Sequence, residues 1–292
     1  MSLFENLLAN LEGFSLAKYS TWFFYGPDHV LLDCGEGVST TLTNRIYAIE
    51  RILLSHGHGD HVAGIPGFLY SRASSMGDTA KPLAIYYPRG DSNIDRLRKY
   101  IAQILPNPPY PLSWIGTGPG ERIELPVPNR HVRTFPTVHL QRGASLGYAV
   151  VESRSRLKKE FAALSQKEIV AVVREKGRDY LTETYEKNLL VYSGDSMPLP
   201  PALAEEAEVL LHEATFLDPG ERDLEIHSTV VEALRVAIEA RVSSLVLFHL
   251  STRYGKKDVK DAIQSAVAAA GTKLPVYYTF PRGLPTSFQR VQ

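Results

Sequence analysis

The sequence predicts an α/β fold arranged as a single domain, from its alternation of apolar and amphipathic segments and from the lack of any linker-like stretch. Short apolar runs bounded by turn residues recur along the chain and are expected to form buried or half-buried strands. These runs are residues 22–25, 30–32, 52–54, 83–87, 189–192, 209–211, 244–248 and 276–278. No Pro/Gly/Ser-rich linker, internal repeat or low-complexity tract interrupts the sequence, so we expect residues 1–292 to form one domain.

Segments with helical periodicity lie between many of the expected strands. In residues 257–270, apolar side chains recur on one face and Gly271 follows as a stop signal, and residues 228–240 have a similar apolar face. Residues 153–186 differ, because they are rich in Lys, Arg and Glu, and their helical pattern around 156–176 has no strong apolar face. We predict that 153–186 is a charged helical insertion, a solvated surface excursion where a partner could also dock.

The charge and cysteine content narrow the possible partners and the kind of site. Lys plus Arg equal Asp plus Glu at 32 each, so a nucleic-acid partner would have to be bound by a local patch of positive charge. Cys34, the one cysteine, is expected to be a small buried residue; a single thiol excludes internal disulfides and multi-thiolate metal sites and favours a reducing compartment. Without a signal-peptide pattern or an apolar stretch of membrane-spanning length, we expect a soluble cytoplasmic protein with no membrane partner.

The segment His56-Gly57-His58-Gly59-Asp60-His61 is the strongest candidate site. It follows the expected strand 52–54, and α/β proteins often place chemistry on loops at the carboxyl ends of strands. Three imidazoles and a carboxylate so close together cannot each find a separate buried partner, and the two glycines are expected to let the backbone bend so that ligands point to two centres. Nitrogen and oxygen ligands without sulfur suit zinc and tolerate other first-row divalent ions, so the segment predicts a metal site.

The string His56-x-His58-x-Asp60-His61 resembles the signature of the metallo-β-lactamase superfamily. The resemblance implies a four-layer αββα sandwich with two metal ions at one edge between two mixed β-sheets. The remaining family ligands should each follow a strand, and the residues in those places are His139, Asp195 and His249. By the resemblance, one ion is held by His56, His58, His139 and Asp195, and the other by Asp60, His61, His249 and the bridging Asp195.

The same resemblance implies hydrolytic chemistry. Two divalent ions, Zn²⁺ or alternatively Mn²⁺ or Fe²⁺, would activate water and neutralise the charge that builds on the attacked centre. The redox members of the superfamily carry Glu where this chain has His58, so a redox role is not expected.

Four further segments narrow the resemblance to ribonuclease Z, the family of endonucleases that remove the 3′ trailer of precursor tRNA. They are Leu32-Asp33-Cys34-Gly35-Glu36-Gly37, His212-Glu213-Ala214-Thr215-Phe216, His227-Ser228-Thr229 and Ser251-Thr252-Arg253-Tyr254. The resemblance implies a homodimer, an RNA substrate, and phosphate contact by Arg253. It also implies that Asp60 accepts a proton from the attacking water and that His227 is the general acid for the departing ribose oxygen.

The roles of the residues around His227 have structural alternatives. His227 is expected to begin a helix, whose dipole lowers an imidazole pKa, so Glu213 would be needed to hold its proton. Alternatively, Glu213 and His212 are polar residues leaving a sheet, and His227 is a helix-start residue beside a Ser228 cap. We assign function to Glu213 and His227 and structure to His212. Asp33 is expected to hold the metal loop through hydrogen bonds to the ligands.

The resemblance fails in two places. Residues 12–21 replace the Gly/Pro-rich loop of most ribonuclease Z sequences, and the Gly-Pro-containing arm that clamps the tRNA elbow has no counterpart, because the charged segment 153–186 stands there instead. Cations of that segment could bind phosphates, although interleaved Glu residues dilute them: Lys158, Lys159, Arg174, Lys176 and Arg178.

Two alternatives therefore stand beside a ribonuclease Z-like endonuclease. One is a phosphodiesterase or esterase for a small molecule, which would use the same metals without tRNA specificity. The other is a non-catalytic RNA-binding or scaffolding protein, and the complete set of metal ligands argues against it.

Overall fold

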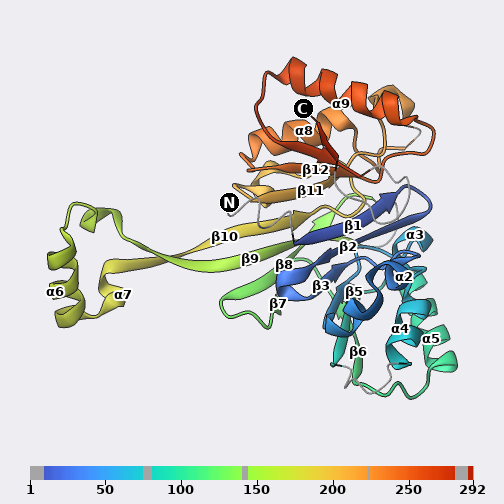
Figure 1. The fold of residues 1–292 in the computed structure, drawn as a ribbon, viewed down its shortest axis with the longest axis horizontal. Helices are drawn as coiled ribbons and strands as arrows, with labels where there is room; N and C mark the ends of the chain where they lie inside the picture. Colours follow the sequence, from blue (N-terminus) through green and yellow to red (C-terminus); the bar gives the residue numbers. More distant parts are fainter. Residues whose placement is uncertain (1–9, 75–80, 140–143, 223, 280–288, 292) are drawn as a thin grey trace.

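Two mixed β-sheets lie face to face, and each carries helices on its outer side (Figure 1). The computed structural model describes residues 10–74, 81–139, 144–222, 224–279 and 289–291. In the described part of the chain, no helix is both long and apolar enough to cross a membrane.

The first sheet has the strand order β1-β2-β3-β4-β5-β6 and is built entirely from the N-terminal part of the chain. Its first three strands are antiparallel, and β3 to β6 run parallel. The strands are β1 Leu11–Leu16, β2 Ser20–Tyr25, β3 Val30–Leu32, β4 Arg51–Leu53, β5 Leu83–Pro88 and β6 Leu112–Thr117. Its helices are α2 Val38–Leu42, α3 Gly59–Val62, α4 Ile65–Ala73 and α5 Ser92–Ile104, with 3₁₀ turns η1 Gly26–Asp28 and η2 Thr43–Ala48.

The second sheet has the order β14-β13-β12-β11-β10-β9-β8-β7, with β10 to β13 parallel. The strands are β7 Arg122–Glu124, β8 Arg130–Thr137, β9 Ser145–Leu157, β10 Thr182–Tyr192, β11 Val209–Glu213, β12 Leu245–Phe248, β13 Val276–Tyr278 and β14 Gln289–Val291. Its outer helices are α8 Val230–Glu239 and α9 Lys256–Ala270, and three 3₁₀ turns are η3 Lys159–Phe161, η4 Pro201–Ala204 and η5 Pro219–Glu221.

Three buried apolar clusters separate the four layers. The central cluster lies between the sheets, where Phe23 of the first sheet packs edge-on against Tyr192 and Phe248 of the second, with ring centroids 5.8 and 5.2 Å apart. A second cluster joins the first sheet to α4 and α5, and a third joins the other sheet to α8 and α9. The expected αββα sandwich is therefore confirmed, because each sheet buries both of its faces.

The eight expected strands are present with small shifts at their ends, except that the strand expected at 189–192 extends over Thr182–Tyr192. The expected helix 257–270 is α9, Lys256–Ala270. The helix expected from residue 228 begins later, at Val230, because Thr229 is the N-cap and forms a capping box with Glu232. The expected helix start at His227 was therefore wrong, and the alternative of a Ser228 cap is not found either.

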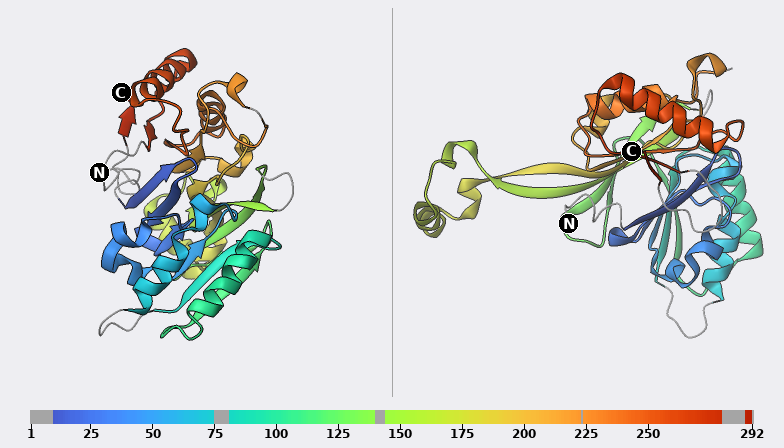
Figure 2. Two further views of the ribbon diagram at one scale, coloured as in Figure 1. Left: turned by 90° about the vertical axis from the view of Figure 1, so that its right-hand side faces the viewer. Right: turned by 45° about the horizontal axis from the view of Figure 1, so that its top comes forward.

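A long two-stranded arm protrudes from the second sheet, contrary to the prediction that none exists (Figures 1 and 2). β9 and β10 remain paired from Tyr192 and Tyr148 in the body out to Thr182 and Leu157, and α6 Gln166–Lys176 and α7 Arg178–Leu181 lie at the tip. Residues 153–186 are thus a helical tip together with the outer halves of two strands. The strands escaped prediction because water surrounds both faces of the arm, so no apolar alternation is required.

Candidate metal centre

The predicted metal ligands all lie at one edge of the sandwich, where strands of both sheets end. β4 leads into His56 and His58, and α3 carries Asp60 and His61. In the second sheet, the ligands beyond the ends of β8, β10 and β12 are His139, Asp195 and His249. Seven side chains from four separate segments of the chain therefore converge on one place, as the sequence predicted.

Gly57 is needed here because of a close approach. Its N–H donates to Asp91 Oδ2 at 2.8 Å, and a Cβ on this residue would collide with the Asp91 carboxylate. Asp91 also caps α5, so the metal loop is tied to that helix. Gly57 and Gly59 are not among the positive-φ residues, so Gly57 serves close packing rather than an unusual backbone angle.

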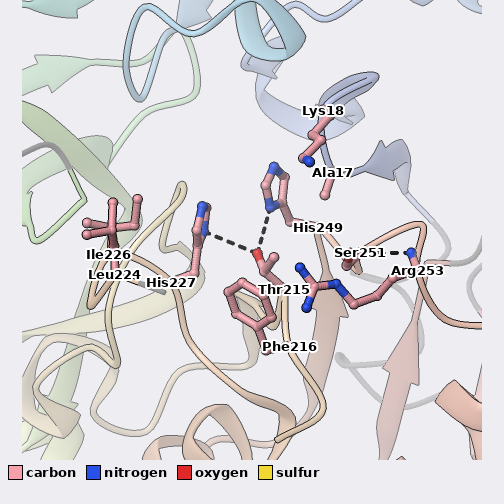
Figure 3. A pocket seen from close by; sticks show the side chains of 10 residues that line it. All are labelled: Ala17, Lys18, Thr215, Phe216, Leu224, Ile226, His227, His249, Ser251 and Arg253. Atoms are coloured by element: carbon pink, nitrogen blue, oxygen red, sulfur yellow. Dashed lines mark hydrogen bonds between the residues drawn. The ribbon is translucent and has the colours of Figure 1, made fainter. Parts of the chain in front are cut away.

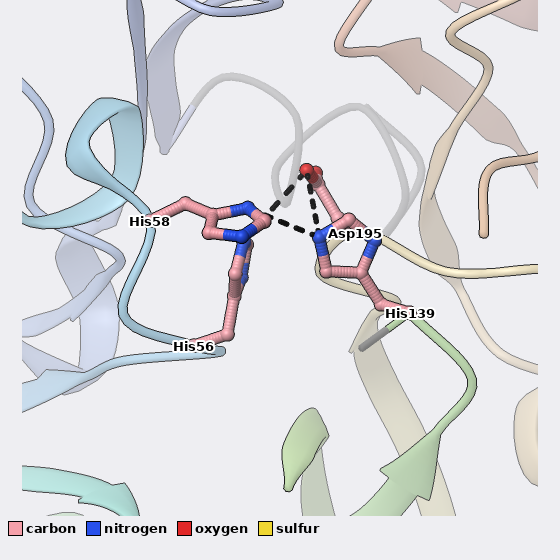
Figure 4. Close-up of side chains that lie close together, drawn as sticks. All are labelled: His56, His58, His139 and Asp195. Carbon is pink, nitrogen blue, oxygen red and sulfur yellow. Dashed lines mark hydrogen bonds and ion pairs between the residues drawn. The ribbon is translucent and has the colours of Figure 1, made fainter. Parts of the chain in front are cut away.

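The first ligand group brings together His56, His58, His139 and Asp195, with ligand atoms within 4.8 Å of one another (Figure 4). The Nε2 atoms of His56 and His139 lie 3.9 and 3.8 Å from Oδ2 of Asp195. Nε2 of His139 is 3.2 Å from Nδ1 of His58. Four donors in this arrangement can surround one ion.

The second group contains Asp60, His61 and His249, again within 4.8 Å. His249 Nε2 lies 3.3 Å from Asp60 Oδ2 and 3.2 Å from Asp195 Oδ2, whereas His61 Nε2 lies 3.4 Å from Asp195 Oδ1. The two oxygens of Asp195 thus face histidines of both groups, as a bridging carboxylate must.

Unpartnered buried atoms are the test of whether metal ions fit this cluster. His56 Nε2, His61 Nε2 and Asp195 Oδ1 are all buried and have no hydrogen-bond partner. Buried polar atoms are normally satisfied, so unpartnered donors that converge on one point fit a cation site. The donor set of imidazole nitrogen and carboxylate oxygen is that of zinc and similar divalent ions, so the residues fit a two-metal centre.

The ionisation of most of these residues also suits cations. Burial lowers the pKa of His56, His58 and His139, which keeps their rings neutral and able to ligate. Burial disfavours the charged form of Asp60, but the contact with His249 and the charge of His61 outweigh it, and the pKa of Asp60 falls to about 2. Burial likewise opposes a charged His61, yet Asp195 and Asp33 raise its pKa well above the usual value, so a metal ion bound at His61 Nε2 would have to displace a proton.

Beside the metal ligands, His227 and Glu213 form a buried pair. Nδ1 of His227 lies 2.8 Å from Glu213 Oε1. Burial lowers the pKa of His227, but the charge of Glu213 and its hydrogen bond outweigh this, so the net shift is upward. His227 precedes the helix cap by two residues, so the helix-start position expected for it was wrong, while the expected contact with Glu213 is present.

Glu213 is held as a carboxylate by its surroundings. Oε1 accepts from the backbone N–H groups of Ser196 and Ser228, and Oε2 accepts from the N–H and hydroxyl of Thr215. Burial raises the pKa of Glu213, but His227 outweighs it and the pKa is lowered. Because Thr215 gives its only hydroxyl proton to Glu213, it must accept from His249 Nδ1 at 2.8 Å, which leaves His249 Nε2 free for a metal.

No model of a known protein family matches the chain. The chain is 31% identical to ribonuclease Z of Natronomonas pharaonis over 252 aligned positions, which cover 78% of this chain and 79% of that protein. It is also 31% identical to ribonuclease Z of Halobacterium salinarum over 273 positions, covering 84% and 83% of the two chains. The chain belongs to the ribonuclease Z family.

Solved structures agree with this fold assignment. The metallo-β-lactamase fold protein YhfI from Bacillus subtilis matches with a TM-score of 0.62 at 19% identity, over 94% of this chain and 98% of that one. The short form of human tRNase Z matches with a TM-score of 0.58 at 24% identity, over 83% and 93%. This ribonuclease Z-family chain therefore has the metallo-β-lactamase fold.

A pocket of about 240 Å³ opens beside His227 and His249 in this ribonuclease Z-family chain (Figure 3). Arg253, the predicted phosphate contact, lies in its wall with its guanidinium 5.1 Å from the ring centroid of Phe216. Lys18 also lines the pocket, and its backbone N–H donates to Asp60 Oδ2 at 3.0 Å. Two cations thus line a pocket that also includes the proposed ligand His249.

Two residues that contact this site, Thr215 and Lys18, were not predicted from the sequence. Thr215 lies within the segment His212-Glu213-Ala214-Thr215-Phe216, so a role for its hydroxyl could have been predicted from the sequence. Lys18 had no such signal, because only the fold of the β1–β2 turn brings it to Asp60. His212 is turned away, since its Nδ1 contacts the backbone oxygen of Glu213 and its Nε2 accepts the Leu199 N–H.

Proposed function

We propose that this chain is a metal-dependent endoribonuclease that removes the 3′ trailer of precursor tRNA. The observation that carries the proposal is the Glu213–His227 pair beside two groups of convergent metal ligands, in a chain of the ribonuclease Z family. The pair supplies a proton donor, which a phosphodiester needs for its departing ribose oxygen and a simple metal site lacks.

Seven residues would hold two divalent ions in this proposal. His56, His58, His139 and Asp195 form one subsite, and Asp60, His61, His249 and Asp195 form the other. When bound, two divalent ions supply Lewis acidity and lower the pKa of water enough for attack near neutral pH. Zn²⁺ is the proposed ion, since nitrogen ligands dominate the set, with Mn²⁺ and Fe²⁺ as alternatives.

The protein's own groups would move the protons. Asp60, ionised above a pKa of about 2, accepts a proton from the attacking water. His227 uses Nδ1 to hold Glu213, so its Nε2 is the nitrogen that can give a proton to the ribose oxygen. Arg253 and Lys18 contact the phosphate groups on either side of the cleaved bond.

The arm is proposed as a second RNA contact, remote from the metal centre. At its tip the ammonium groups of Lys158 and Lys176 lie 5.8 and 4.8 Å from the ring centroid of Tyr180. Cations held around an aromatic ring suit a nucleic-acid backbone. The expected lack of an arm was the reason for weighing a small-molecule substrate, and the presence of the arm removes that reason. We also propose a homodimer, and a cytoplasmic location where precursor tRNA is found.

The decisive experiment compares two substrates with the purified, metal-loaded protein. One is a precursor tRNA with a 3′ trailer, and the other is a chromogenic phosphodiester. We expect accurate removal of the trailer. Robust turnover of the small ester without trailer removal would replace the tRNA assignment by the small-molecule phosphodiesterase, and a protein that binds no metal would overturn both.

A further inference from the structure

Behind the metal ligands, the carboxylate of Asp33 accepts hydrogen bonds from several donors at once. Oδ1 accepts the Ser55 N–H at 2.6 Å. Oδ2 lies 2.7 Å from Ser55 Oγ, 2.7 Å from His61 Nδ1 and 2.5 Å from the hydroxyl of Tyr192. All four residues are buried, so water does not compete for these bonds.

Asp33 fixes the tautomer of His61 directly. A carboxylate can only accept, so Nδ1 of His61 carries the hydrogen and donates it. In the neutral ring, the form that can ligate, the lone pair of His61 is then on Nε2, the buried atom without a hydrogen-bond partner.

Asp33 also reaches His56, through Ser55. The Ser55 hydroxyl has one hydrogen and donates it to Asp33, so toward His56 Nδ1, 3.0 Å away, it can only accept. His56 therefore carries its hydrogen on Nδ1 and presents an unprotonated Nε2, which is likewise buried and unpartnered. One carboxylate thus sets the ligating nitrogen in both metal subsites.

Tyr192 links this arrangement to the other sheet. Asp33 follows β3 of the first sheet, whereas Tyr192 ends β10 of the second, three residues before Asp195. Burial and the charge of Asp33 raise the pKa of Tyr192 well above its usual range, so the hydroxyl remains a donor. Asp33 has a φ of +55°, an uncommon angle for a residue with a side chain, which its four hydrogen bonds hold in place.

We propose that Asp33, Ser55 and Tyr192 form one positioning unit that couples the two metal subsites, with Tyr192 setting the place of Asp33 from across the sheet interface. The inference rests on the proposed two-metal centre and adds residues that no ligand motif contains. Loss of the Tyr192 hydroxyl should weaken both subsites, because Asp33 Oδ2 serves both. Loss of the Ser55 hydroxyl should weaken chiefly the subsite of His56, because His61 keeps its own bond to Asp33.

The chain offers a matched control in Tyr148. It pairs with Tyr192 across β9 and β10, is equally buried, and donates its hydroxyl to the Leu54 carbonyl at 2.6 Å instead of to Asp33. Tyr148→Phe and Tyr192→Phe therefore remove the same group from neighbouring places in the same core. Only the second should change metal binding.

The test is a titration of the metal-free full-length protein with Co²⁺, in which the visible absorption bands of bound Co²⁺ report binding. Thermal unfolding of the metal-free forms checks that each variant is folded. In Tyr192→Phe we expect both binding steps to weaken by about 10- to 100-fold, in Ser55→Ala mainly one, and in Tyr148→Phe neither. Equal effects of Tyr192→Phe and Tyr148→Phe on Co²⁺ affinity, or no effect of either, would overturn the inference. If the wild-type protein still bound about two ions, the proposed metal centre would stand. A wild-type protein that binds no Co²⁺ would instead count against the proposed function. If Tyr192→Phe fails to fold, Ser55→Ala decides by whether one step weakens.

Discussion

His227 Nδ1 lies 2.8 Å from Glu213 Oε1, and every other bond to that carboxylate comes from a backbone N–H or from Thr215. Glu213 is thus fixed before a substrate arrives, and among the described residues His227 is its one partner that titrates near neutral pH. The ring of His227 also stacks on that of His249, with centroids 5.3 Å apart, so the proposed proton donor is packed against one of the proposed ligands.

His227→Ala is expected to slow trailer removal by about 10² to 10⁴ in kcat, the usual contribution of a positioned general acid. His227 is not one of the seven proposed ligands, so the metal content should remain about two ions per chain. Single-turnover cleavage and metal analysis of the same preparation check both statements. Unchanged cleavage would show that another group donates the proton.

The pair also predicts a pH dependence. Glu213 raises the pKa of His227, so the proton needed for donation is present below that pKa and is lost as pH rises through it. Glu213→Gln removes the negative charge, and the alkaline limb of kcat against pH should move to lower pH. The NH2 group of the Gln amide would face N–H donors, so the free energy of unfolding should also fall by about 1–3 kcal/mol. The profiles of kcat against pH are therefore measured at a temperature at which both proteins are folded. An unmoved alkaline limb would contradict the assignment.

Lys18 offers a test of the pocket in which the side chain is removed and the backbone hydrogen bond to Asp60 is kept. It has a φ of +70°, which Gly adopts more easily, and its N–H to Asp60 would persist in Lys18→Gly. We expect a several-fold rise in KM for precursor tRNA with little change in kcat, because the ammonium contributes uniform binding. Arg241→Gly is the control, since Arg241 has a φ of +54° and lies before β12, at the end of the sheet opposite His249. Equal effects on KM in the two variants would show a non-specific effect of charge.

The clustering of the proposed ligands and the central strands could be predicted from the sequence, because both leave strong local patterns. Buried parallel strands such as β4 and β12 are short apolar runs, and His56 to His61 are concentrated within one loop. Edge and exposed strands leave weaker patterns: β6 buries little of its length, and β8 contains Pro136. The arm was missed for the same reason, since its outward faces carry ion pairs such as Arg156–Glu183 where a buried sheet would carry apolar residues.

The residues behind the ligands were harder to predict than the ligands themselves. Asp33 was expected to contact the metal loop, and it does so through Ser55 and His61. Tyr192 was expected only as the end of a buried strand. Its bond to Asp33 joins residues 159 positions apart in different sheets, and no local pattern reports such a contact.

The arm gives the last prediction. Changing Lys158, Lys176 and Arg178 to Ala should weaken precursor tRNA binding and reduce the salt dependence of log K, by up to about 0.9 in slope for each phosphate that is no longer neutralised. Turnover of a small phosphodiester should be unchanged, because α6 and α7 lie at the far end of the β9–β10 ribbon from α3, which carries Asp60 and His61 (Figure 1). Binding measured at several salt concentrations separates this effect from damage to the active site. If the triple variant bound precursor tRNA with wild-type affinity and salt slope, the arm would not be an electrostatic contact, and tRNA recognition would have to reside near the pocket of Lys18 and Arg253.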